Sequence, residues 1–111
     1  MTANAPLDEV VTGFLEKKLD LIKREYAPSM LLVFGSRARG TAAPDSDIDL
    51  MIVSERFEET RYPNRMGEFL NRIWPDVAVD AICYTPEEFE RLVAKGFPFV
   101  KFALRDGIRV V

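Results

Sequence analysis

Hydrophobic residues recur along the chain with two different periods, and these periods divide it into helices and strands. Between residues 7 and 26 the apolar positions repeat every three or four residues, which predicts an amphipathic helix that ends before Pro28. A similar repeat occupies roughly 59–74 and stops at Pro75. Each of the two predicted helices therefore has one apolar face that must be buried against another element.

Shorter segments have the length and composition of strands. Residues 30–34 form a continuous apolar run that ends at a glycine, whereas polar and apolar side chains alternate over residues 47–53. Residues 77–84 are apolar apart from one acid, and residues 108–111 are expected to form a last edge strand. The chain therefore supplies three strands and the start of a fourth.

The region after the third predicted strand is expected to be helical. Thr85 and Glu88 have the spacing of a capping box, which begins a helix that runs to about Lys95. The apolar stretch 97–104 is predicted to be helical as well. The order of elements indicates one domain over residues 1–111, of the α/β or α+β class, in which helices flank a small mixed β-sheet.

Composition changes this picture mainly by exclusion. The 111 residues include no histidine, which excludes Ser-His-Asp triads, histidine bases and histidine metal ligands. A net charge of −3 argues against a surface that grips long nucleic acid, because such domains are usually basic. The single Cys83, the absence of a signal-like pattern in residues 1–6 and the lack of a long apolar run lead us to expect a cytoplasmic protein.

Paired acids are the first candidate for chemistry. Asp47 and Asp49 are two apart in a predicted strand, so they lie on one face with Cα atoms ~6.6 Å apart. Their carboxylates repel by roughly 2.5 kcal/mol at an effective dielectric of about 20, and Mg²⁺ would offset that repulsion. Asp80 interrupts the third apolar strand and needs solvent, a partner or a metal. Taken alone, the Asp-x-Asp pair favours a solvated strand end over a metal site.

A glycine-serine turn is the second candidate. Gly35 and Ser36 follow the first strand, where backbone amides and the serine hydroxyl could donate to phosphate oxygens. Arg37 and Arg39 stand close enough in sequence to neutralise a triphosphate, although they also fit a solvated surface. A P-loop is excluded because Thr41 and Ala42 stand where that motif requires lysine and serine or threonine.

Together these residues resemble a known group of enzymes. Phe34-Gly35-Ser36-Arg37-Ala38-Arg39-Gly40, then Asp45-Ser46-Asp47-Ile48-Asp49-Leu50 and Asp80 on a later strand, resemble the DNA polymerase beta-like nucleotidyltransferase superfamily. The short length and the Gly-Ser-Arg-Ala-Arg-Gly motif look most like those of the minimal nucleotidyltransferases, which are antitoxin partners of HEPN-domain ribonuclease toxins. The resemblance covers nearly the whole chain.

The resemblance implies a fold, a reaction and a role for each residue. Gly35 and Ser36 would hold the β- and γ-phosphates, Asp47 and Asp49 would bind Mg²⁺, and Asp80 would complete a second metal site and help deprotonate the attacking hydroxyl. The donor would be ATP. The acceptor would be a hydroxyl, that of a tyrosine of a partner HEPN toxin, which adenylylation would silence.

Three other functions remain open at this stage. The chain could neutralise its partner by binding alone, or could modify a small molecule such as an antibiotic after assembling a pocket with another chain. A polymerase is the weakest option, because a small acidic domain offers little surface for nucleic acid.

Outside these motifs, Cys83 and Trp74 are interpreted as packing residues, and residues 55–59 as a solvated loop. The Phe97-Pro98-Phe99 cluster fits core and surface equally well.

Overall fold

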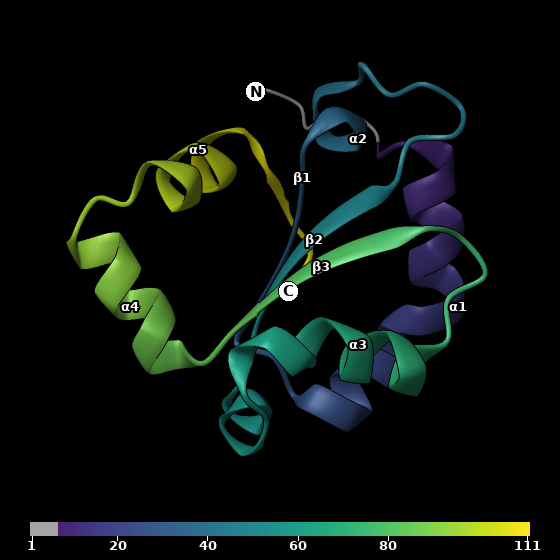
Figure 1. Ribbon diagram of the computed structural model, residues 1–111. Helices are drawn as coiled ribbons and strands as arrows, with labels where there is room; N and C mark the ends of the chain where they lie inside the picture. The colour runs from purple at the N-terminus through teal and green to yellow at the C-terminus, as the bar shows by residue number, and fades with distance from the viewer. Residues whose placement is uncertain (1–6) are drawn as a thin grey trace.

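A four-stranded mixed sheet organises the chain, and its strand order is β3-β2-β1-β4 (Figure 1). The computed structural model describes residues 7–111, so the segment examined for a signal sequence lies outside the described residues. β1 (Met30–Phe34) is antiparallel to both of its neighbours, β2 (Ile48–Val53) and β4 (Ile108–Arg109). β3 (Val79–Tyr84) is parallel to β2 and lies at one edge of the sheet. The expected mixed sheet with flanking helices is confirmed.

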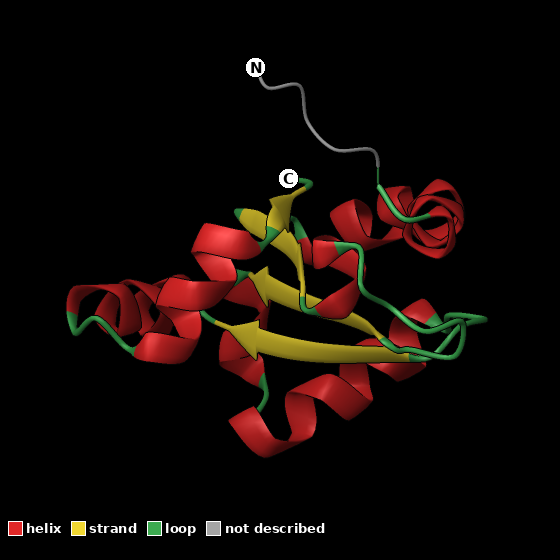
Figure 2. Ribbon diagram, turned by 90° about the horizontal axis from the view of Figure 1, so that it is seen from above, coloured by secondary structure: helices red, strands yellow, loops and turns green. Residues whose placement is uncertain are grey.

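Helices cover both faces of this sheet, as Figure 2 shows from above. The helical segments are α1 (Glu9–Tyr26), α2 (Ser36–Arg39), a 3₁₀ turn (Glu55–Glu59), α3 (Tyr62–Ile73), α4 (Pro86–Ala94) and α5 (Pro98–Asp106). Among the described residues no helix combines the length and the apolar character needed to cross a bilayer.

Alternation along the strands assigns side chains to two separate cores. Leu31, Val33 and Ile48 belong to the larger core, which α1 and α3 complete with Phe14, Phe69 and other residues. Leu32 and Met51 belong to the smaller core on the opposite face, which α5 completes with Val100 and Ala103. Because neighbouring side chains on a strand point to opposite faces, the apolar run of β1 serves both cores.

The ends of the two long helices have local causes. α1 begins where the Asp8 side chain accepts hydrogen bonds from the Val10 and Val11 amides, and it ends at Ala27 in the left-handed region, just before Pro28. α3 begins at Tyr62, three residues later than the sequence pattern predicts.

Two local interpretations need correction. Residues 55–59 form a 3₁₀ turn that buries Phe57 in the larger core, so they are not simply a solvated loop. Trp74 is 74% exposed and holds a left-handed backbone conformation after α3, so it is not a packing residue. Cys83, in contrast, is buried as expected, and burial raises the pKa of its thiol to about 12.

One ion pair joins α3, β3 and α4. The buried Arg65 guanidinium donates to both carboxylate oxygens of Glu88, at 2.6 and 3.2 Å, and to the Cys83 carbonyl. Glu88 also completes the predicted capping box with Thr85. One carboxylate therefore holds the start of α4 against α3.

This ion pair makes a pH-dependent contribution to stability. The Arg65 hydrogen bond lowers the pKa of Glu88 below its ordinary value of 4.5, so the contribution is complete above that pH and is lost as the pH falls through the folded pKa. We expect Glu88→Gln to lower the free energy of unfolding by about 1–2 kcal/mol at pH 7 and by much less at pH 3. Urea unfolding of both proteins at the two pH values measures the difference, and a gap independent of pH would contradict the assignment.

Candidate functional site

Acidic residues from two strands meet at one end of the sheet. In the strand register Asp49 of β2 lies opposite Asp80 of β3 on one side and Phe34 of β1 on the other. Residues in register share a face, so both carboxylates lie on the side of the sheet that α4 and α5 cover. Asp47 directly precedes β2 and is exposed, as is Asp80, whereas Asp49 is half-buried. The three acids singled out in the sequence are thus brought together by the fold.

The charges of these carboxylates act on one another. Partial burial raises the pKa of Asp49, the negative charges of Asp80 and Asp47 raise it further, and Arg39 opposes them. Within the described chain no hydrogen bond or ion pair to another side chain restrains any of the three acids. Three carboxylates with one opposing arginine therefore leave this end of the sheet negatively charged.

A hard cation fits this donor set. Magnesium prefers oxygen ligands, and carboxylates on neighbouring strands supply them. Among residues 7–111, no three acidic or cysteine side chains lie close enough together in this structure to hold a metal ion. Asp47 and Asp80 are exposed and can turn toward Asp49, so a cation would draw the three groups together.

Gly35 positions the turn that follows β1. Its φ of +73° lies in the region that favours glycine, and a Cβ atom there would be only 2.2 Å from Oδ2 of Asp49. The Ala38 and Arg39 amides donate to the Gly35 carbonyl and so close the short helix α2. The first amides of a helix lack intrahelical acceptors, so the Ser36 amide and hydroxyl are available at this turn, beside the acids.

Alanine at position 35 therefore encounters both strain and a collision. We expect Gly35→Ala to lower the free energy of unfolding by about 1–2 kcal/mol for the left-handed backbone and to displace the Asp49 carboxylate in addition. Gly40→Ala is the matched control, because Gly40 has a φ of +77° but nothing within 4 Å of the added Cβ. Chemical unfolding together with Mg·ATP titration of both variants makes the comparison. Equal losses of ATP affinity in the two variants would contradict the proposed contact.

Arg37 does not face the acids, and the expectation that it helps to neutralise a triphosphate is corrected. Its guanidinium is buried and donates to both carboxylate oxygens of Asp8, at 3.1 and 3.0 Å. It also donates to the carbonyls of Pro44 and Ser46. Arg37 therefore fastens the loop before β2 to the start of α1, and its donors are already used.

Arg39, in contrast, remains at the site. It is exposed, its charge opposes the raised pKa of Asp49, and it adds to the effect of Arg105, whose hydrogen bond is the main cause of the lowered pKa of Asp106. Arg39 and Gly35 line a hollow of about 240 Å³ whose other walls come mainly from α5. Those walls include Phe99, Phe102 and Asp106, which sequence reasoning did not associate with the site. No local signal could have done so, because 64 to 71 residues separate them from Gly35.

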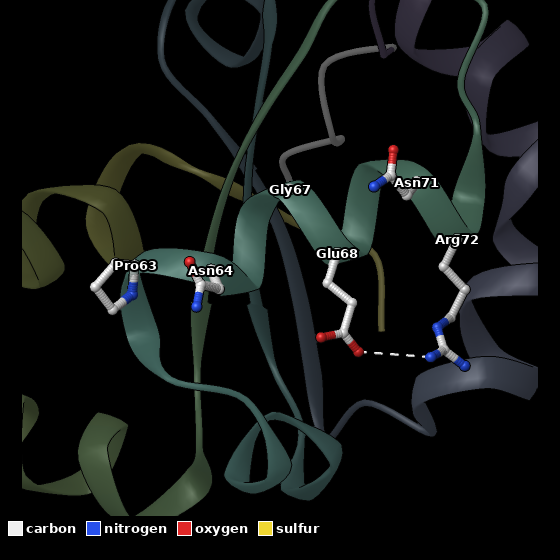
Figure 3. Close-up of a pocket in the computed structure, with 6 residues that line it drawn as sticks. All are labelled: Pro63, Asn64, Gly67, Glu68, Asn71 and Arg72. Carbon is white, nitrogen blue, oxygen red and sulfur yellow. Dashed lines mark hydrogen bonds and ion pairs between the residues drawn. The ribbon is translucent and has the colours of Figure 1, made fainter.

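A larger hollow lies elsewhere in the described chain. It measures about 670 Å³ and runs along the outer face of α3, where Figure 3 shows Asn64, Glu68 and Arg72 among its lining residues. Glu68 already accepts a hydrogen bond from Thr60 and pairs with Arg72. With its one carboxylate already occupied, this groove lacks the chemistry found at the end of the sheet, which we take as the functional site.

Comparisons with known proteins agree with this geometry. A protein of Methanocaldococcus jannaschii named "putative protein adenylyltransferase" is 37% identical over 63 residues, which are 57% of this chain and 59% of the relative. The chain thus spans about three-fifths of that relative. The crystal structure of a "putative nucleotidyltransferase" from Sulfolobus solfataricus superposes with a TM-score of 0.56 over 96% of this chain and 90% of that one. At 19% identity this second likeness concerns the fold alone.

The match to a protein family is broader. The family described as "Nucleotidyltransferase domain" matches residues 15–110, a span that contains the glycine-serine turn and all three acids. Because this match extends over most of the chain, the protein belongs to the nucleotidyltransferase domain family.

Proposed function

We propose that this nucleotidyltransferase uses Mg²⁺ to transfer AMP from ATP to a hydroxyl group of a polypeptide. The observation that carries the proposal is the strand register, which sets Asp49 beside Asp80 and directly against Gly35. A polypeptide acceptor is supported by the name of the M. jannaschii relative, which is that of a protein adenylyltransferase.

Asp47 and Asp49 are the residues that would hold a first Mg²⁺, and Asp80 would complete a second site with Asp49. When bound, the metal offsets negative charge on the attacked phosphate and on the departing pyrophosphate. Burial raises the pKa of Asp49 first, and the negative charges of Asp80 and Asp47 raise it further, which is the repulsion that a bound cation would offset.

The other groups of the site orient the reactants. The Ser36 amide and hydroxyl donate to oxygens of the β- and γ-phosphates, and Gly35 lets the phosphates approach the backbone. An Asp80 carboxylate oxygen accepts the proton of the acceptor hydroxyl, whose oxygen bonds to the α-phosphorus. The bond from the α-phosphorus to the oxygen bridging to the β-phosphate breaks, and pyrophosphate leaves. Positioning and charge neutralisation supply most of the rate in such transfers, so no histidine is required.

We infer further that the acceptor is a tyrosine of a HEPN-domain toxin and that its adenylylation makes this chain an antitoxin in the cytoplasm. This assignment rests on the resemblance of residues 34–50 and Asp80 to the minimal nucleotidyltransferases.

Incubation with α-³²P-labelled ATP and Mg²⁺, with and without the protein encoded beside this one, tests the proposal. We expect label on a tyrosine of that partner, loss of label with Asp47→Asn, and full label with Asp45→Asn, an exposed acid outside the strand. If the partner is bound and inhibited but never labelled, binding alone accounts for the function. Label on a small alcohol instead would indicate a small-molecule nucleotidyltransferase.

A further inference from the structure

The hollow beside Gly35 includes exposed side chains of α5 to which the proposed transfer of AMP assigns no role. Its walls come from the end of β1, from the turn after it and from α5, and they are Phe34, Gly35, Arg39, Phe99, Phe102, Ala103 and Asp106. In sequence the α5 residues are remote from the glycine-serine turn. They return to it because β4, which follows α5, pairs with the end of β1 through Ile108 and Val33.

Two phenylalanine rings in this hollow are unusually accessible for apolar side chains. Phe99 is 37% exposed and Phe102 is 49% exposed. Phe99 packs edge-on against Phe34 with ring centroids 5.5 Å apart, which fixes its orientation. Arg105 covers one face of the Phe102 ring at 4.9 Å. The hollow therefore presents rigidly held aromatic surface, the kind on which a nucleobase stacks.

The polar groups of the hollow are an acceptor and a cation. Asp106 is held by Arg105, whose Nε and Nη2 donate to its two carboxylate oxygens at 3.0 Å each. An ionised carboxylate has about four lone-pair positions, so Asp106 can accept further hydrogen bonds but cannot donate. Arg39 lies on the side toward Asp49 and adds positive charge between the hollow and the acids.

From these observations we propose that the hollow binds the purine base of the nucleotide, with stacking against Phe99 and Phe102 and with Asp106 accepting from the exocyclic amino group. The inference rests on the proposed function, because the phosphates are taken to face Gly35 and Ser36. A volume of about 240 Å³ is below the range of about 300–1,000 Å³ that encloses drug-sized ligands, so the hollow suits one base rather than a whole nucleotide.

Affinities for ATP, ITP and inorganic tripolyphosphate, measured by calorimetry with Mg²⁺, test the assignment. ITP lacks the amino group and tripolyphosphate lacks the base. We expect the wild-type protein to bind ATP about tenfold more tightly than ITP, which is the usual effect of one hydrogen bond to a charged group. Asp106→Ala should reduce that ratio to about one. Phe102→Ala should weaken ATP and ITP alike, by about tenfold, and leave tripolyphosphate unchanged.

Phe97→Ala is the matched control. Phe97 is 43% exposed and directly precedes α5, but it lines a different hollow, with Val93, Lys101 and Leu104. The Phe97→Ala variant should bind all three ligands as the wild type does, and circular dichroism should show that every variant is folded.

The possible failures are distinguishable. If tripolyphosphate and ATP bind but the Phe102 and Asp106 variants behave as wild type, the base lies elsewhere and this inference is overturned while the proposed function stands. If the folded wild-type protein binds neither ATP nor tripolyphosphate, the proposed function fails and the base site fails with it.

Discussion

Asp49→Asn is expected to abolish nucleotidyl transfer and yet leave the folded protein at least as stable as the wild type. The half-buried carboxylate lies beside Asp80 and two residues from Asp47, and both neighbours raise its pKa after burial itself. Asparagine has nearly the same shape and removes the charge. We expect the free energy of unfolding without metal to rise by about 0.5–1 kcal/mol, because partly exposed charges are well screened.

The expected loss of activity has the opposite origin. The same repulsion that destabilises the metal-free protein attracts a cation, so the loss of one negative charge weakens the binding of that cation. Transfer should fall by about 10³-fold or more, which is the usual size of the loss when a group that stabilises transition-state charge is removed. The site thus trades stability for function.

Urea unfolding with and without Mg²⁺, together with the labelling assay, measures both effects. The wild-type protein should gain stability on addition of Mg²⁺, and Asp49→Asn should not. Asp45→Asn, which alters an exposed acid outside the strand, should behave as the wild type in both assays. A variant at position 49 that lost stability, or that still transferred the nucleotide, would sink this account.

Substitution of the two arginines after Ser36 is expected to have opposite effects. Arg37 is 6% exposed, and its guanidinium donates to the Asp8 carboxylate and to the carbonyls of Pro44 and Ser46. Arg37→Ala leaves these acceptors unpaired, and we expect it to lower the free energy of unfolding by about 3 kcal/mol. For a domain of this size the melting temperature should fall by roughly 10 °C or more.

Arg39 should behave differently because its side chain is exposed and pairs with no carboxylate within the described chain. Arg39→Ala should change the free energy of unfolding by less than about 0.5 kcal/mol while weakening the binding of ATP and of tripolyphosphate. Calorimetric melting and ligand titration of the two variants separate these roles. If Arg37→Ala melts like the wild type, its hydrogen bonds do not hold the loop as the structure indicates.

Much of the fold follows from local pattern. The helical repeat before Pro28, the apolar run of residues 30–34 and the capping box at Thr85 each depend on interactions within a few residues, and all three elements form where the sequence predicts them. Boundaries were less predictable. The second long helix begins at Tyr62 rather than near 59, because Phe57 is buried by a separate 3₁₀ turn.

Exposure was the feature that local pattern misjudged most. Trp74 has the size and apolar character of a core residue, but it follows the last turn of α3 with a φ of 52° and faces solvent. The apolar face of a helix is apparent from the spacing of its apolar residues. The side-chain direction of a residue just beyond the helix end depends instead on the path of the chain to the next strand.

The sequence by itself determined the elements, the fold class and the chemical character of the site, because a glycine-serine turn and a pair of acids two apart on a strand are local features. Only the tertiary structure decided which groups meet. The parallel register of β2 and β3 places Asp80 beside Asp49, and the pairing of β4 with β1 returns α5 to Gly35. Arg37 and Arg39 are two residues apart and cannot be distinguished by local sequence. The Arg37 guanidinium nevertheless donates to Asp8, twenty-nine residues away, whereas Arg39 does not. Such choices depend on contacts between residues distant along the chain, and therefore on how the whole core packs.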